Sequence, residues 1–513
     1  MTEPTASRWR GLKLASGPLL GLLVYLVARG SLPLPAVKVL VVTVWTAAWW
    51  VTEAIPIPAT SLLPAFLLPT LGVCNADQAA KYYAHWLILL LLGGFIIARG
   101  IEASGLHRRF ALRVLGWVGE SRRALVFGFL ISSALLSMWI SNTATTLMLL
   151  PIALSVVRTV ESSDASHSSD DSVAPSSFSI ALLLAIAYGA NVGGVGTLIG
   201  TPPNLIFANT VEELGRTHPD IALGFTPDFL TWLGFGLPVV VIFIPVIGIL
   251  LTRVFFRLPG GTSRSAAARL LEERRALGRN SSRERRVLVI FSLVALLWIF
   301  RGGQNMPGWS TLLVKLGWFD AATISIFLRD SSVALLGALL MFIVPSEPRS
   351  ARGILEWHEV ESVPWGMLLL FGGGFAIAGE FEATGLSGVI GNGMSTWVAW
   401  PKPALVGTIS LAVTFLTEIT SNTASTNMLM PILSSASVSG EVHPLVLLLP
   451  AVLSVSFAFM LPVATAPNAI VFSSGRLPIL QMVRVGFFLN LIGPLIVLGV
   501  MYGIVRPLYG LPF

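Results

Sequence analysis

The chain has 513 residues, of which 54% are hydrophobic and only 12% are charged, and its mean hydropathy is +0.80. Soluble domains carry about 25% charged residues, so this composition excludes an ordinary soluble globular protein. The net charge of +7 does not indicate nucleic-acid binding, because the arginines gather in loops between apolar stretches.

Long apolar stretches recur along the chain, and several approach the roughly 20 residues with which a helix crosses a bilayer. Strands of a membrane β-barrel would instead alternate in polarity over about ten residues. We therefore expect an all-α polytopic membrane protein without a soluble catalytic domain. The first stretch follows three basic residues, but no small-residue cleavage site ends it, so we expect an uncleaved helix. The clearest stretches are residues 12–28, 37–51, 87–103, 229–251 and 485–505.

The segment 123–158 does not read as a simple span. Its apolar arms, 125–136 and 147–157, flank the polar tip Ser141-Asn142-Thr143. Arms this short predict a re-entrant hairpin, which a membrane protein tolerates where protein or water surrounds the tip. The loop 161–177 that follows is rich in Ser and Asp and is expected to be disordered, so His167 within it is expected to be solvated rather than a metal ligand.

A second interruption lies within residues 179–210, where a Gly-rich run leads into Thr201-Pro202-Pro203-Asn204. This pattern predicts a helix that breaks near the bilayer midplane. The run lacks the lysine of a phosphate-binding loop and lies in apolar sequence, which argues against nucleotide binding. Farther along, residues 253–286 hold ten Arg and three Glu, a bias that places a loop in the cytoplasm.

The second half of the chain repeats the first. Residues 421–432 match residues 141–152 at nine of twelve positions, with an offset of 280. The repeat predicts a second hairpin over 403–437 with the tip Ser421-Asn422-Thr423. It also predicts a second broken helix over 445–474, where Thr465-Ala466-Pro467-Asn468 matches the first break at an offset of 264. Paired interruptions in two halves are the best sequence indication of a transporter site.

The positive-inside rule predicts about eleven crossings, with the N-terminus in the cytoplasm and the C-terminus outside. The two halves are then inverted, and their hairpins enter the membrane from opposite sides. Residues 301–332 mix charged and apolar side chains and are not assigned. The expected divisions are 1–85 (N-terminal scaffold helices), 86–255 (first repeat, with the cytoplasmic-side hairpin), 256–286 (basic cytoplasmic linker), 287–364 (scaffold helices of the second half) and 365–513 (second repeat, with the outer-side hairpin).

The two tips offer ligands for ions of both signs. Hydroxyl, carboxamide and backbone oxygens suit hard cations such as Na⁺, and free N–H groups at a helix N-terminus suit an anion. Ser137 and Thr417 each lie four residues before a tip serine, a spacing that predicts one shared helical face. Helix–helix contacts or hydroxyl bonds to the preceding turn are the structural alternatives, and the duplication favours a binding site.

Three acidic residues complete the candidates. Glu418 lies in the second hairpin beside Thr417, and its counterpart in the first hairpin is Met138. Charges within spans are usually functional, so Glu418 is expected to support the cation site or to pair with another segment. Glu380 and Glu382 lie near an expected span end and are expected to be solvated.

Twin Ser-Asn-Thr tips, each followed by a Thr-Pro-Pro-Asn type of break, resemble the divalent anion/sodium symporter (DASS) family over about residues 15–505. The resemblance implies eleven crossings, two opposed hairpins, a homodimeric scaffold and a transport domain that moves as an elevator. It implies one Na⁺ site at Ser137, Ser141, Asn142 and Gly200, a second at Thr417, Ser421, Asn422 and Ala464, and substrate contacts from Asn142, Thr143, Asn422, Thr423, Thr201, Thr465 and Pro202. Ala466 departs from the family, which usually has proline there.

These observations lead to an expected function of Na⁺-coupled symport of a di- or tricarboxylate, with a C4-dicarboxylate such as succinate, malate or fumarate favoured. A Na⁺-independent dicarboxylate exchanger and a carrier of sulfate or another divalent anion remain alternatives. An enzyme is disfavoured because the six histidines form no metal-spaced pair. The expected partners are the bilayer of the inner cell membrane, Na⁺, a small anion and a second copy of the chain, with no organic cofactor and no nucleic acid.

Overall fold

The computed structural model describes residues 3–119, 121–165, 175–219, 221, 223, 225, 227–259, 264–302, 308–320, 323–324 and 328–510. Every regular element within these ranges is a helix, and an isolated β-bridge joins Pro345 to Gly353. His167 lies outside the described residues, as does most of the loop expected to be disordered. The unassigned segment 301–332 is described only in part.

The first half begins with the long helices α1 and α2 and ends with α12, whose last turns widen into the π-helix η2. Its helices are α1 (Glu3–Ala28), α2 (Leu34–Thr52), α3 (Ile57–Thr60), α4 (Leu63–Thr70), α5 (Ala76–Tyr83), α6 (Trp86–Ser104), α7 (Leu106–Val118), α8 (Arg122–Ser137), α9 (Asn142–Ala165), α10 (Ser177–Gly193), η1 (Gly194–Gly196), α11 (Pro202–Thr217), α12 (Phe229–Ile249) and η2 (Leu250–Phe255).

The second half follows the basic linker helix α13 and again ends in a π-helix, η3. Its helices are α13 (Arg264–Ala276), α14 (Ser282–Ile299), α15 (Trp309–Lys315), α17 (Asp330–Ile343), α18 (Trp357–Val360), α19 (Trp365–Ala383), α20 (Leu386–Val398), α21 (Lys402–Leu416), α22 (Asn422–Ser439), α23 (Leu445–Ser454), α24 (Ala466–Ser473), α25 (Ile479–Val500), η3 (Met501–Val505) and α26 (Arg506–Tyr509).

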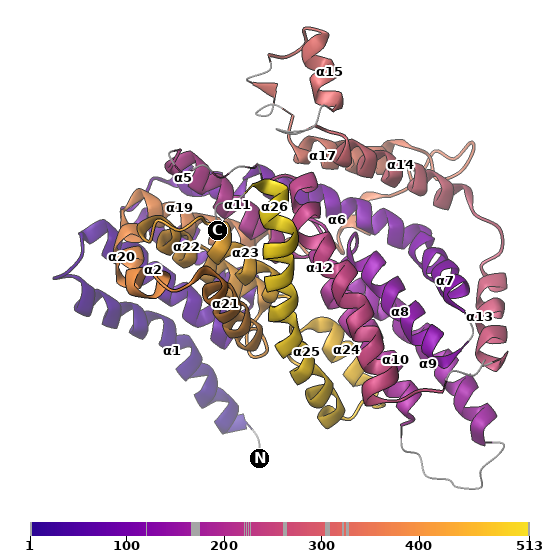
Figure 1. The fold of residues 1–513 in the computed structure, drawn as a ribbon. Helices are drawn as coiled ribbons and strands as arrows, with labels where there is room; N and C mark the ends of the chain where they lie inside the picture. Colours follow the sequence, from indigo (N-terminus) through magenta and orange to yellow (C-terminus); the bar gives the residue numbers. More distant parts are fainter. Residues whose placement is uncertain are drawn as a thin grey trace.

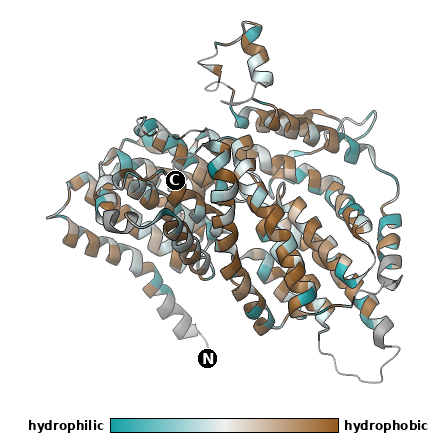
Figure 2. Cartoon of the chain, viewed as in Figure 1, coloured by the Kyte–Doolittle hydropathy of each residue, from teal (hydrophilic) through white to brown (hydrophobic). Residues whose placement is uncertain are grey.

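The predicted all-α polytopic fold is confirmed. Among the described residues, eight helices are long and apolar enough to cross a membrane, and four shorter apolar helices accompany them. Hydrophobic residues run along most of α12 and α25, as Figure 2 shows. Helix length alone does not count the crossings, so the number eleven and the division into five segments stay predictions.

Both predicted hairpins and both predicted breaks are present as pairs of helices. Tips separate α8 from α9 and α21 from α22, while irregular segments separate α10 from α11 and α23 from α24. One expectation about the arms is wrong. Helix α9 has 24 residues and therefore extends about 36 Å, enough to cross a bilayer, because it begins at Asn142 in the tip and continues through the mostly polar residues 158–165.

The two halves interlock. Helix α8 packs on α10, and its counterpart α21 packs on α23 and α25. Helix α11, from the break of the first half, packs on the hairpin arm α22 of the second half, and α24 packs in turn on the hairpin arm α9. Figure 1 shows α25 running beside α12 at the centre of the molecule and α15 standing apart beyond α14 and α17.

The basic linker lies along the first half. Helix α13 packs on α7 and α9. Arg108 forms an ion pair with Glu273 (2.6 Å), and Arg109 forms one with Glu284 (2.9 Å). Arg269 donates a hydrogen bond to the Ser155 hydroxyl on α9 (2.7 Å). The linker is thus held in place beside the first hairpin by charged contacts.

Candidate functional site

The first tip turns sharply between two helices. Helix α8 ends at Ser137, and Ser141 accepts a hydrogen bond from the backbone N–H of Ala144 (3.2 Å), which caps the start of α9 as serine commonly does. The buried Ser137 hydroxyl donates to Asn142 Oδ1 at 2.6 Å. This bond fixes the carboxamide of Asn142 against the end of the first arm.

The second tip repeats this bond. Thr417 Oγ1 lies 2.5 Å from Asn422 Oδ1 and 2.8 Å from the carbonyl oxygen of Val455. The tips differ at their serines, because Ser421 begins α22 without a side-chain capping bond. The equivalent pairs therefore place a hydroxyl and a carboxamide oxygen together at the end of each first arm.

The expected geometry of the serines is wrong. A four-residue spacing predicted that Ser137 and Ser141 share a helical face, as would Thr417 and Ser421. Helices α8 and α21 instead end at Ser137 and Leu416, so each tip serine lies beyond its helix. The hydroxyls of Ser137 and Thr417 reach the asparagines rather than the preceding turn.

Buried asparagines hold the two broken helices in shape. Asn204 Nδ2 donates to the carbonyl oxygens of Gly194 (3.1 Å) and Thr197 (2.7 Å). Its counterpart Asn468 donates to those of Ala458 (2.9 Å) and Leu461 (3.0 Å). Each carboxamide replaces helix bonds that the break has lost, which is necessary because unpaired buried backbone groups are costly.

Glycines allow the first break to lie close to the first tip. A Cβ on Gly194 would lie 2.8 Å from Asn142 Oδ1, and a Cβ on Gly200 would lie 2.4 Å from the carbonyl oxygen of Gly194. Side chains at either position would push the break away from Asn142. The Gly-rich run therefore serves close packing.

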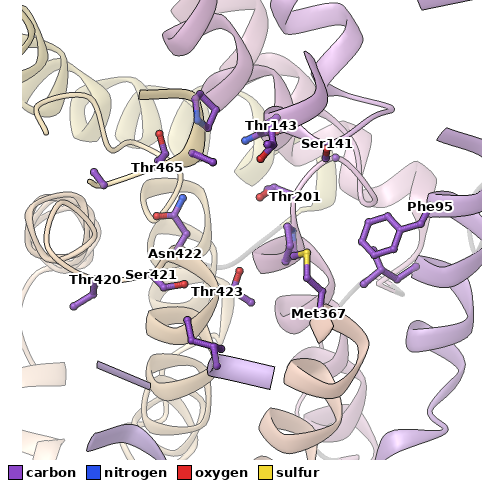
Figure 3. Close-up of a pocket in the computed structure, with 18 of the residues that line it drawn as sticks. Phe95, Ser141, Thr143, Thr201, Met367, Thr420, Ser421, Asn422, Thr423 and Thr465 are labelled. Carbon is purple, nitrogen blue, oxygen red and sulfur yellow. The ribbon is translucent and has the colours of Figure 1, made fainter. Parts of the chain in front are cut away.

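Tips and breaks enclose one cavity of about 500 Å³. Figure 3 shows Ser141, Thr143 and Thr201 from the first half on one side, with Ser421, Asn422, Thr423 and Thr465 from the second half facing them. The residues that begin α9, α11, α22 and α24 all line this cavity: Asn142, Pro202, Asn422 and Ala466. Four helix N-termini therefore meet there, each carrying about half a positive charge.

Charged side chains are scarce around the cavity. Among the described residues that line it, none is Lys, Arg or His, and Glu53 is the one carboxylate. The walls are otherwise hydroxyls, carboxamides, backbone and apolar side chains that include Phe95, Trp139 and Met367. Such a cavity can bind an anion through helix N-termini and hydrogen bonds, with cations rather than basic side chains supplying the full positive charges.

The structure brings almost all of the sequence-predicted residues to this cavity. Ser137 and Thr417 lie directly behind the lining, fully buried, and bond to Asn142 and Asn422. The predicted residues that line the cavity itself are Ser141, Asn142, Thr143, Gly200, Thr201, Pro202, Ser421, Asn422, Thr423, Ala464 and Thr465.

Glu418 supports the second break directly. Its side chain is buried (3% exposed), and its Oε1 accepts bonds from the backbone N–H groups of Phe459 (2.7 Å) and Met460 (2.9 Å) and from Asn490 Nδ2 (2.7 Å). Its Oε2 accepts from the N–H of Leu461 (3.0 Å). The carboxylate thus binds another segment of the chain, one of the two roles expected for it.

Two features of the buried polar network were not predicted. Glu380 is only 3% exposed and accepts a hydrogen bond from the Tyr82 hydroxyl (3.1 Å), so the expectation that it is solvated is wrong. Asn191, near the C-terminal end of the apolar helix α10, reaches the second break. A carboxamide inside an apolar span was the available signal, since such residues usually pair across helices.

Comparisons with known proteins agree with this architecture. The sodium:sulfate symporter transmembrane region family matches residues 19–510. Proteins named sodium-dependent dicarboxylate transporter SdcS, from Staphylococcus saprophyticus and from Staphylococcus aureus strain USA300, are each 37% identical to this chain over 502 residues. The match covers 96% of this chain and 91% of each relative.

The solved structure of the Alcanivorax borkumensis YdaH transporter shares the fold, with a TM-score of 0.55 at 13% identity, over 92% of this chain and 99% of that one. Family match, relatives and fold all describe multi-pass membrane transporters, and nearly the whole chain takes part. The chain therefore belongs to the sodium:sulfate symporter transmembrane region family, the divalent anion/sodium symporters that its paired tips resemble.

Proposed function

We propose that this protein is a secondary active transporter that couples Na⁺ entry to uptake of a C4-dicarboxylate such as succinate, malate or fumarate. The names of the Staphylococcus relatives support both the ion and the substrate class. The observation that carries the proposal is a cavity in which four helix N-termini meet but basic side chains are absent from the described lining.

The arrangement of helix ends explains how ions of both signs fit together. Each first arm ends at its tip and presents carbonyl groups and partial negative charge, which favours a cation. Each second arm begins there and presents N–H groups, which favour an anion. A hairpin tip therefore has a cation-binding side at the end of its first arm and an anion-binding side at the start of its second arm, where the asparagine lies.

We assign two Na⁺ sites on this basis. The first comprises Ser137, Ser141, Asn142 and the backbone of Gly200, and the second comprises Thr417, Ser421, Asn422 and the backbone of Ala464. All are oxygen ligands, as Na⁺ requires of a protein site. The bonds from Ser137 and Thr417 to the two carboxamide oxygens, at 2.6 and 2.5 Å, already bring the necessary oxygens together.

The dicarboxylate is proposed to lie between the tips. Its carboxylates receive hydrogen bonds from Asn142, Thr143, Asn422 and Thr423, and from Thr201 and Thr465 of the breaks. Pro202 has no N–H to donate and is proposed to contact the substrate without a hydrogen bond. Four N-termini supply roughly two positive charges in total. Na⁺ supplies the remainder, because a dianion in a poorly solvated site is otherwise strongly disfavoured.

Coupling follows from this charge balance. Substrate binds tightly only when Na⁺ has ordered the tips, so the cavity crosses the membrane either loaded or empty. Each net elementary charge that moves through 100 mV gains about 2.3 kcal/mol. Symport of more positive than negative charge therefore draws energy from the membrane potential in addition to the Na⁺ gradient.

We further propose that the hairpins and broken helices move together against the remaining helices as an elevator. Their interlocked packing supports a single moving unit. At one end of this unit, Glu212 on α11 pairs with Arg329, beside α17, and accepts a hydrogen bond from the Trp86 indole of α6 (2.8 Å). These contacts would break when the unit moves.

The proposed orientation places the N-terminus and basic linker in the cytoplasm and the C-terminus outside, in the inner membrane. Cys74 is the chain's single cysteine, so Cys74→Ser provides a background for thiol labelling. Gly278→Cys should react with an impermeant maleimide only in permeabilised cells, whereas Gly510→Cys should react in intact cells. The opposite labelling pattern would reverse the orientation. A homodimer, implied by the family resemblance, is tested by light scattering of the purified protein.

Transport itself is tested in proteoliposomes. Radiolabelled succinate uptake is measured with Na⁺ or K⁺ outside, with and without succinate inside, and with unlabelled malate, fumarate, citrate and sulfate as competitors. Uptake should require Na⁺ and should not require internal substrate. Equal uptake in Na⁺ and K⁺ would contradict symport, and dependence on internal anion would favour the exchanger.

A further inference from the structure

Asn191, in the first half of the chain, forms hydrogen bonds with the second break. It lies in α10, is 1% exposed, and its Nδ2 lies 3.1 Å from Thr465 Oγ1, 3.2 Å from Asn468 Oδ1 and 3.3 Å from the carbonyl oxygen of Ala458. All three partners belong to the segment that joins α23 to α24 or begins α24. A residue remote in sequence from Thr465 therefore touches a cavity-lining hydroxyl from behind.

The orientation of this carboxamide follows from its neighbours. Asn468 Nδ2 donates to the carbonyls of Ala458 and Leu461, so its Oδ1 is the atom that faces Asn191. With Nδ2 turned toward the break, Asn191 offers two hydrogens to acceptor oxygens, whereas the flipped amide would place its oxygen against two groups that only accept, Asn468 Oδ1 and the Ala458 carbonyl. The contacts with Thr465 (3.1 Å) and Asn468 (3.2 Å) are shorter than the contact with Ala458 (3.3 Å), so we assign the two hydrogens of Asn191 to Thr465 and Asn468.

The hydroxyl of Thr465 can then form one more hydrogen bond, in which it is the donor. A hydroxyl donates once and accepts twice. Thr465 Oγ1 accepts from Asn191 Nδ2 (3.1 Å) and from the backbone N–H of Asn468 (3.3 Å), which uses both lone pairs. Thr465 lines the cavity at the N-terminus of α24, so its hydrogen remains available to a ligand in the cavity.

The equivalent residue of the first half is not constrained in this way. Thr201 precedes α11 as its N-cap residue and makes no side-chain capping bond. The position that matches Asn191 at the offset of 264 is Val455, which has no polar side chain. Thr201 can therefore donate or accept, whereas Thr465 can only donate. The near-symmetric site therefore has one threonine, Thr465, that can only donate and one, Thr201, that can do either.

We propose that Asn191 is a positioning residue that makes Thr465 an obligate hydrogen-bond donor to a carboxylate oxygen of the transported anion. The inference rests on the proposed function, since it requires a carboxylate in the cavity. A donor-only hydroxyl at this place favours an acceptor-only group and contributes nothing to a cation. Asn191 should therefore govern the affinity for the anion and leave Na⁺ affinity unchanged.

The test is a double-mutant cycle in proteoliposomes. Asn191→Val introduces the residue found at the matching position of the second half. It should raise KM for succinate about tenfold, the factor given by about 1.4 kcal/mol, with the Na⁺ half-saturation within about twofold of wild type. Thr465→Val should raise KM at least as much. Adding Asn191→Val to Thr465→Val should raise it no further, because coupled residues are not additive.

The control is Tyr188→Phe, from the same helix. Tyr188 also bonds across to the second half, through its hydroxyl to the Phe459 carbonyl (2.9 Å), but no hydrogen bond joins it to Thr465 among the described contacts. The KM of Tyr188→Phe for succinate should stay within about twofold of wild type. If Asn191→Val does not give a monodisperse protein, Asn191→Ser is used, since serine keeps a polar group but is too short to reach Thr465.

The outcomes separate the two proposals. A wild type without Na⁺-dependent succinate uptake contradicts the proposed function, and this inference with it. A wild type that transports succinate, with an Asn191→Val KM that is unchanged or with effects that add in the double mutant, overturns the inference alone. An equal weakening of Na⁺ and succinate affinity would assign Asn191 a merely structural role.

Discussion

Glu418 provides a sharp test of how the second break is held. Replacing it by Gln keeps the shape of the side chain and removes the charge. The amide oxygen can still accept from Phe459, Met460 and Asn490, but the amide nitrogen would face the N–H of Leu461, a donor that the carboxylate now satisfies at 3.0 Å. Two donors would then oppose each other in a buried place.

The size of the effect follows from these four bonds. Hydrogen bonds to charged groups contribute about 1.5–3 kcal/mol each, and an orphaned buried donor costs about 1–3 kcal/mol. Removing the charge recovers part of its desolvation penalty. We therefore expect Glu418→Gln to destabilise the folded state by about 2–3 kcal/mol. Glu418→Met, which introduces the residue of the first half, should destabilise it more because it orphans all four donors.

The assay is thermal unfolding of the purified protein in detergent, with and without saturating Na⁺. Glu441→Gln is the matched control, because Glu441 is an exposed glutamate of the same half. The expected order of melting temperature is wild type and Glu441→Gln, then Glu418→Gln, then Glu418→Met. Na⁺ should also stabilise the Glu418 variants less, since a looser break binds it less well. Melting of Glu418→Gln at the wild-type temperature would refute this account of the break.

Three further changes test other parts of the structure. Gly200→Ala should reduce Na⁺-dependent uptake at least tenfold, through about 1–3 kcal/mol of strain, whereas Gly407→Ala, with open space around its Cβ, should transport normally. Arg301 forms ion pairs with Asp228 and Asp330. Arg301→Met removes the positive charge between these two carboxylates and should lower the free energy of unfolding by about 3–5 kcal/mol, without changing the Na⁺ half-saturation. An unchanged melting temperature would argue against this role of Arg301. Glu212→Gln removes the partly exposed ion pair with Arg329, and such pairs contribute up to about 1 kcal/mol. The yield of a disulfide between cysteines placed on α11 and α17 should therefore change about two- to fivefold. An unchanged yield would remove this ion pair from the elevator proposal.

The duplicated parts of the site were predictable from sequence. Two copies of one motif at a fixed offset reveal equivalent positions directly, so both tips and both breaks were located, and the structure gathers them around one cavity. Proline marks the breaks because it lacks the N–H that a helix needs, and glycine marks them because its backbone freedom makes it a poor helix former. Composition was sufficient for the membrane fold, since few structures other than helices bury so much apolar sequence.

Features that depend on long-range contacts were not predictable. The pairing of Asn191 with Thr465 joins positions 274 residues apart, and the repeat itself conceals it because Val455 stands at the matching place. Glu380 was expected to be solvated since only the fold brings Tyr82 to it. The helical-face interpretation of Ser137 and Ser141 failed because the spacing holds only while a helix continues, and α8 ends between them.

The central helices α10 and α23 have a consequence for biogenesis. Apart from Ser177, every residue of the two helices is buried. Each packs on the two hairpin arms of its own half, while α10 also contacts α24 and α23 also contacts α11. Neither half on its own could cover these surfaces. A chain divided within the basic linker should therefore give two fragments that are degraded when expressed singly and that assemble when expressed together.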